Sequence, residues 1–115
     1  MNSEKNYLPR LKSELKLTAE QLEAVETLAS TNFAPRKIAK YLDVDEATFM
    51  KEWYQKESLV RTHFDRGILL TDFKIAEKLK ATAEAGNITA TQEFRKIQEA
   101  NKIEQLKQEL FDNEY

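Results

Sequence analysis

The sequence predicts an all-α fold, and three observations support this prediction. The chain of 115 residues contains only two glycines and two prolines. Sheets need frequent turns, so this scarcity favours a few helices with short connections. Apolar residues also recur three and four positions apart, which is the spacing of one helix face. We expect an N-terminal helix-turn-helix followed by a long antiparallel helical hairpin.

Two helices are expected before the motif. In Tyr7–Lys16, Pro9 suits the first helical turn, and Leu8, Leu11 and Leu15 lie at helical spacing. Thr18 with Gln21 has the form of a capping box, in which each side chain bonds the other residue's amide. The helix that begins there is expected to end near Thr31–Asn32.

The segment Phe33–Lys56 has the pattern of a helix-turn-helix. The turn is expected at 43–45, with Asp45 capping the second helix, which is expected to stop near Glu57–Ser58. Ala39 supplies the small residue that two closely crossing helices need. The expected core residues of the motif are Ile38, Leu42, Val44, Phe49 and Trp53. In the DNA-reading version the second helix enters the major groove; the alternative is a helical hairpin that never contacts DNA.

The second half of the chain is expected to form two long helices. The first is Leu59–Ala85, which contains Gly67, and Gly86-Asn87 ends it. Thr89 with Gln92 has the form of a second capping box, and the last helix is expected to run to about Phe111. Because a short loop places two helices antiparallel, we expect a helix-turn-helix domain over 1–57 and a hairpin domain over 58–115.

Both long helices have more than one apolar face. At about 100° per residue, the first helix has one face with Val60, Phe64, Ile68, Ile75 and Leu79, and a second with Leu59, Leu69, Leu70, Phe73 and Ala76. On the last helix, Ala90, Phe94 and Ile97 share one face, and Ile103, Leu106 and Leu110 share another. Uncovered apolar faces are typical of interfaces. We therefore predict self-association through Leu59, Leu69, Leu70, Phe73, Ile103, Leu106 and Leu110; the alternative is that Leu8, Leu11 and Leu15 fold back over the uncovered face.

Composition and motifs bear on function. The absence of cysteine excludes disulfides and thiolate metal sites and favours an intracellular location. No run of residues suits a membrane span or a nucleotide-binding loop. The single histidine, His63, is interpreted as an ordinary polar helix residue, because a metal site needs several ligands. We expect a non-enzymatic cytoplasmic protein without cofactor, metal or membrane partner.

The expected partner is double-stranded DNA, although the net charge is −2. Lysine and arginine on the first helix of the motif are expected to meet phosphates, and polar residues of the second helix to face the groove. The residues expected to face DNA are Arg36, Lys37, Lys40, Thr48, Lys51 and Gln55. Acidic residues on the second helix oppose this: Asp45, Glu46, Glu52 and Glu57. Tyr41, Trp53 and Tyr54 are interpreted as core residues rather than base-stacking ones.

Three segments together resemble the small subunits of phage terminases, which recognise DNA for packaging. They are the helix-turn-helix Pro35–Trp53, the run Phe64-Asp-Arg-Gly67, and the junction Ala83–Ala90. The resemblance covers roughly Thr18 to Ile97. It implies DNA binding through the helix-turn-helix, a ring built by the hairpin, and contact between a C-terminal segment and a terminase large subunit in a bacterial host cell.

Two other functions are compatible with the same helices. A dimeric helix-turn-helix transcription regulator would bind a palindromic site as a two-fold dimer. A protein-interaction adaptor would use the hairpin surface without binding DNA. Solution mass and DNA binding separate the three.

Overall fold

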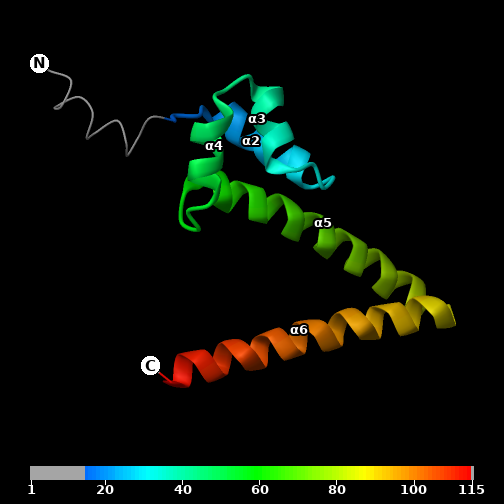
Figure 1. Ribbon diagram of the computed structural model, residues 1–115. Helices are drawn as coiled ribbons and strands as arrows, with labels where there is room; N and C mark the ends of the chain where they lie inside the picture. The colour runs from blue at the N-terminus through cyan, green and yellow to red at the C-terminus, as the bar shows by residue number, and fades with distance from the viewer. Residues whose placement is uncertain (1–14, 115) are drawn as a thin grey trace, which may run out of the picture. The chain divides into compact units, whose positions relative to one another are not determined.

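The computed structural model describes residues 15–114, and these residues form helices and connecting turns without a strand (Figure 1). The all-α prediction is confirmed. The helices are α2 (Ala19–Ala29), α3 (Pro35–Leu42), α4 (Glu46–Trp53), α5 (Leu59–Glu84) and α6 (Ile88–Glu114). Most of the helix predicted at Tyr7–Lys16 lies outside the described residues. Within the described part, no helix combines the length and the apolar character needed to cross a bilayer.

The chain divides into two compact units, the first ending at Thr71 and the second beginning at Asp72. The division falls within α5 and not at 57/58, where the sequence places it. The reason is that the first turns of α5 contribute Val60 and Phe64 to the buried core of the first unit. The two units are described separately below.

Helix α2 begins and ends as its sequence indicates. The Thr18 amide donates to Gln21 Oε1 at 2.8 Å, and the Gln21 amide donates to Thr18 Oγ1 at 3.1 Å, so the predicted capping box is confirmed. Beyond its last residue, Asn32 adopts a left-handed conformation with φ of 68°. Asparagine tolerates this conformation better than most residues, which explains the stop predicted near Thr31–Asn32.

The core of the first unit collects apolar side chains from four helices. Ile38, Ala39 and Phe49 have no exposed surface, which confirms their predicted burial. The remaining buried residues are Val25, Ala29, Met50, Val60 and Phe64. Leu42, Val44 and Trp53 pack against this cluster while partly exposed. Burying a large apolar side chain stabilises a fold by about 1.5–3 kcal/mol, so this cluster is what holds α2, α3, α4 and the start of α5 together.

The turn between α3 and α4 lies at 43–45, as predicted. Asp43 is left-handed with φ of 58°, and the Val44 amide reaches back to the Ala39 carbonyl at 3.2 Å. Asp45 then caps α4 by accepting from the Thr48 amide at 2.9 Å. These local bonds set the crossing of the two helices.

Helix α4 ends at Trp53, earlier than the predicted stop near Glu57–Ser58. Ser58 instead serves the start of α5. Its hydroxyl accepts from the Arg61 amide at 3.1 Å and donates to the Glu52 carbonyl at 2.6 Å. Capping by Ser58 therefore links the end of α4 to the beginning of α5.

Gly67 is buried where α5 passes α2 at very close range. A Cβ at this position would overlap the carbonyl oxygen of Glu26 and lie 2.9 Å from its carbonyl carbon. Glycine within a helix costs about 1 kcal/mol relative to alanine. Glycine is nevertheless required here, because any larger residue would clash with the Glu26 backbone of α2.

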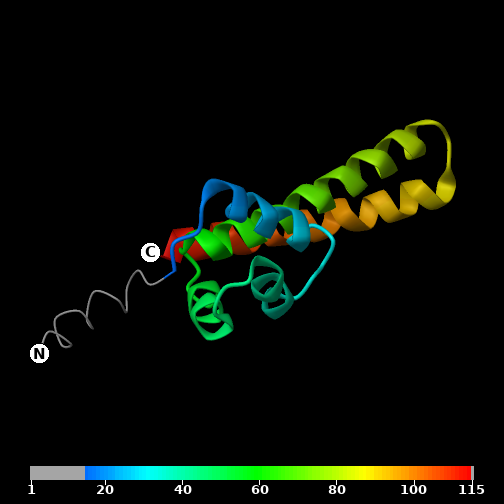
Figure 2. The ribbon, with the colours of Figure 1, turned by 90° about the horizontal axis from the view of Figure 1, so that it is seen from above.

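In the second unit, the chain reverses at the turn between α5 and α6 (Figure 2). Gly86 has φ of 103°, which confirms the predicted left-handed stop. The predicted capping box of Thr89 and Gln92 is wrong: α6 already begins at Ile88, because the Asn87 side chain accepts from the Ala90 amide at 2.8 Å. Asparagine is a better N-cap than threonine, and Asn87, directly after Gly86, caps α6.

Candidate nucleic-acid interface

The outward face of α3 carries two exposed lysines and an exposed tyrosine. Lys37, Lys40 and Tyr41 lie three and four positions apart, so they share one helix face. Ile38 and Ala39 occupy the opposite, buried face. Neither lysine takes part in an ion pair with another described residue. This face therefore offers uncompensated positive charge to an anionic partner.

Arg36, expected to contact phosphate, is engaged within the protein. Its Nη1 lies 2.7 Å from Glu46 Oε2, joining the first turn of α3 to the first turn of α4. Both side chains are about half exposed, at 61% and 45%. An exposed pair of this kind contributes about 0.2–1 kcal/mol. The pair neutralises one of the acidic residues that oppose DNA binding, and it also occupies one of the expected contacts.

Asp45 and Thr48 form a closed local network at the start of α4. The Thr48 hydroxyl donates to Asp45 Oδ2 at 2.7 Å, and its amide donates to the same oxygen. These two hydrogen bonds, the hydroxyl one first, hold the pKa of the Asp45 carboxyl below its ordinary value of 3.8. Asp45 thus acts as a helix cap, and the Thr48 hydroxyl is committed to it rather than free to contact a base.

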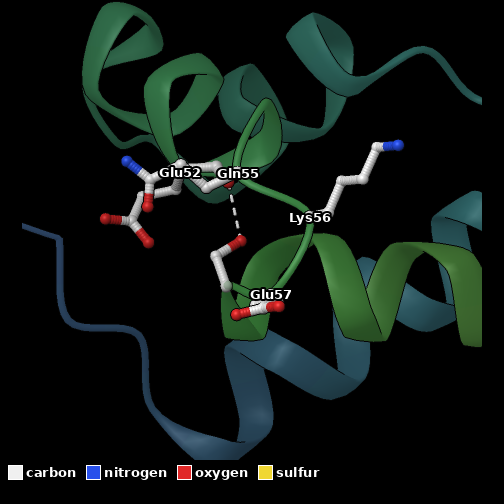
Figure 3. Close-up of a pocket in the computed structure, with 5 residues that line it drawn as sticks. Glu52, Gln55, Lys56 and Glu57 are labelled. Atoms are coloured by element: carbon white, nitrogen blue, oxygen red, sulfur yellow. Dashed lines mark hydrogen bonds between the residues drawn. The ribbon is translucent and has the colours of Figure 1, made fainter. Parts of the chain in front are cut away.

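The remaining predicted contacts on α4 differ in position. Lys51 is exposed and shares the outward face with Ala47 and Tyr54. Gln55 lies beyond the end of α4 at Trp53, in the connection to α5. It lines a shallow hollow whose walls are Glu52, Gln55, Lys56, Glu57 and Ser58 (Figure 3). The sequence predicted that α4 would present the amide of Gln55, but the residue lies beyond the end of that helix.

The three aromatic residues interpreted as core separate into two groups. Trp53 is half-buried, meets Phe64 edge-on at 5.5 Å between ring centroids, and is covered by the Arg61 guanidinium at 4.2 Å. The core interpretation is confirmed for Trp53. It is wrong for Tyr41 and Tyr54, which are 70% and 65% exposed. Tyr41 lies four positions after the charged Lys37 and one after the charged Lys40, and this polar neighbourhood is the signal in the sequence that indicates exposure.

His63 joins α5 to α2 through a pairing that the sequence does not reveal. Its Nδ1 lies 2.7 Å from Glu26 Oε2, and Arg66 Nε lies 3.7 Å from the same oxygen. Across residues 15–114, no group of three or more histidine, cysteine or acidic residues is placed to hold a metal ion. His63 therefore acts as a contact between helices beside the close approach at Gly67.

The residues predicted to mediate self-association are exposed on both long helices. Those on α5 are Leu59, Leu69, Leu70 and Phe73, and those on α6 are Ile103, Leu106 and Leu110. By contrast, Ala90 is buried and Phe94 and Ile97 are half-buried, as expected for the first half of α6. Of the leucines in the alternative, Leu15 packs against the core of the first unit, and Leu8 and Leu11 lie outside the described residues. The structure therefore confirms that these apolar residues are exposed, and association through them stays a prediction.

No protein-family model, no curated protein and no solved structure matches this chain. The resemblance to terminase small subunits accordingly depends on its three short segments. Function is therefore inferred from the residues themselves: exposed lysines on two crossing helices, and exposed apolar residues on two long ones.

Proposed function

We propose that this protein is a DNA-binding assembly subunit with a role similar to that of a terminase small subunit. The observation that carries the proposal is that Lys37, Lys40 and Lys51 are exposed on the two crossing helices of a helix-turn-helix. Such lysines suit phosphate oxygens spaced along a DNA backbone. The exposed apolar residues of α5 and α6 would hold several copies together.

The arrangement of the motif supports contact with phosphates more than reading of bases. The Thr48 hydroxyl is hydrogen-bonded to Asp45, and Arg36 is paired with Glu46. Gln55 lies beyond the end of α4, the helix expected to enter the groove. The side chains best suited to hydrogen-bond base edges are thus engaged or displaced. Lysine acts as a point charge toward phosphate. Binding is expected to tolerate many sequences and to weaken steeply with salt, with a slope near −3 for three phosphates per copy.

One copy alone would bind weakly. The chain carries a net charge of −2, whereas free-standing DNA-binding domains are usually basic. Linking several modest sites on one DNA raises the overall affinity by about 10²–10⁴ without any new contact. Self-association is therefore a functional part of the proposal, and a large subunit that acts on the bound DNA is the partner that the resemblance implies.

The proposal is tested by measuring duplex DNA binding by fluorescence anisotropy across a range of salt. The variant Lys37→Glu with Lys40→Glu is expected to weaken binding by more than about tenfold, because two phosphate contacts are lost and repulsion is added. The matched control, Lys78→Glu with Lys80→Glu, makes the same charge change on exposed positions of α5. Equal loss in both variants would contradict a site on α3.

Solution mass separates this proposal from the other two functions. A mass of many copies together with salt-sensitive DNA binding supports an assembly subunit. A two-fold dimer that selects a palindrome from random duplexes would favour a transcription regulator. Absence of DNA binding at low salt, in a protein that still self-associates, would favour an adaptor.

A further inference from the structure

The second half of α6 presents an apolar stripe that is exposed within the described part of the chain, residues 15–114. Ile103, Leu106 and Leu110 follow at three- and four-residue spacing and are 49%, 51% and 67% exposed. Every residue from 101 to 112 is exposed. A stripe of this spacing is the narrow seam typical of two paired helices.

The chain's own α5 is a poor match for this stripe. Successive residues of both helices advance equally, by about 1.5 Å, so a closed hairpin would pair positions equally distant from Gly86. Leu106 would then meet Arg66, and Leu110 would meet Thr62. Only Ile103 would meet an apolar residue. A second copy of α6, in contrast, offers the same apolar residues to the stripe.

Charges beside the stripe select the orientation of the second copy. Lys102 and Glu109 lie seven positions apart and flank one edge, and Lys107 flanks the other. In a parallel pair, Lys102 would face Lys107 of the second copy. In an antiparallel pair with Ile103 opposite Leu106, Lys102 of each copy faces Glu109 of the other. Charges at such flanking positions set partner choice and orientation.

We infer that two copies of this protein associate through antiparallel pairing of their α6 helices at Ile103, Leu106 and Leu110, aligned by two Lys102–Glu109 pairs. This inference rests on the proposed function, for which it names the contact between subunits. The exposed residues of α5 form a separate apolar surface, so a pair made through α6 retains a second surface for growth into a larger assembly.

Charge reversal across the pair tests the inference with the full-length protein. Lys102→Glu and Glu109→Lys each place two like-charged pairs in the antiparallel dimer. Each variant alone is expected to associate more weakly, so that it dissociates at a protein concentration roughly tenfold higher than the wild type does. An equimolar mixture is expected to recover wild-type association, since every facing pair is again of opposite charge. Sedimentation velocity over a concentration series measures the association of each variant and of their mixture.

Other results overturn the inference. In a parallel pair, Lys102→Glu would face Lys107 and would tighten association. In a hairpin closed within one chain, neither variant would change the mass. Failure of the mixture to recover, when each variant alone has lost association, would also contradict facing Lys102–Glu109 pairs.

Leu106→Glu separates failure of this inference from failure of the proposed function. Leu106 is exposed, so this substitution is expected to leave the first unit folded, which Trp53 fluorescence would show. Association is expected to be lost. If the wild type assembles and Leu106→Glu assembles equally, pairing through α6 is overturned, whereas DNA binding by an assembly through another surface stands. A wild type that is monomeric at all concentrations overturns both.

Discussion

The two units of this protein use their apolar residues in opposite ways. The first buries Val25, Ile38 and Phe49 completely, with side chains from α2, α3, α4 and α5 meeting in one cluster. In the second, Ala90 is the one described residue that is buried, and Phe73, Leu106 and other large apolar residues are exposed. The first unit therefore has its own folding core, while the second leaves most of its large apolar side chains exposed. Helix α5 belongs to both.

The largest expected effect is the difference in the free energy of unfolding between truncating a buried apolar residue and truncating an exposed one. Phe49→Ala removes a fully buried ring and is expected to lower the free energy of unfolding by about 3–5 kcal/mol. Leu106→Ala, at 51% exposure, is expected to change it by less than about 0.5 kcal/mol in dilute protein. Urea unfolding followed by the fluorescence of Trp53 measures both. Similar losses would mean that the second half of α6 is buried in the isolated chain.

A smaller difference in stability is expected between alanine substitutions at the two glycines. Gly67→Ala forces α5 away from the Glu26 backbone and is expected to cost about 2–3 kcal/mol, even though alanine favours helix. Gly86→Ala meets no neighbouring atom within 4 Å, but at φ of 103° alanine strains the turn, which lies in the second unit and outside the core that Trp53 reports. The urea midpoint reported by Trp53 is expected to fall for the first variant and to stay for the second. A midpoint unchanged by Gly67→Ala would contradict the close approach of α5 to α2.

The smallest effect is the pH dependence contributed by Asp45. Its pKa is lowered by the two bonds from Thr48, so the stability it supplies is complete above its unfolded pKa. That contribution is lost as pH falls through the folded pKa, which lies below 3.8. Asp45→Asn keeps a capping oxygen but removes the titration. Relative to this variant, the wild type is expected to lose stability as pH approaches and passes below 3.8; a constant difference would contradict the role of the carboxylate.

Features that depend on neighbouring residues were predictable from the sequence. The capping box of Thr18, the cap at Asp45 and the left-handed stop at Gly86 each follow from chemistry within a few positions. The burial of Ile38 and Phe49 follows from helical spacing. Asn87 and Thr89 are both residues that cap helices, and the start of α6 predicted from Thr89 was two residues late.

Features that depend on residues far apart in the chain were not predictable. The pairing of His63 with Glu26 and the close approach at Gly67 arise only when α5 meets α2. At the candidate site, the exposure of Lys37, Lys40 and Lys51 follows from their helix faces. The commitment of Arg36 to Glu46 requires the crossing of α3 over α4, which no spacing along the chain reveals.

Cooperation between copies on DNA is tested most directly by making the protein monomeric without altering its first unit. Phe73→Glu with Leu106→Glu places a charge on each exposed apolar surface, and the lysines of α3 and α4 are untouched. At low salt, duplex DNA is expected to bind this variant about 100-fold more weakly than the wild type, with an unchanged urea midpoint for Trp53. A monomeric variant that binds DNA as tightly as the wild type would contradict the proposal.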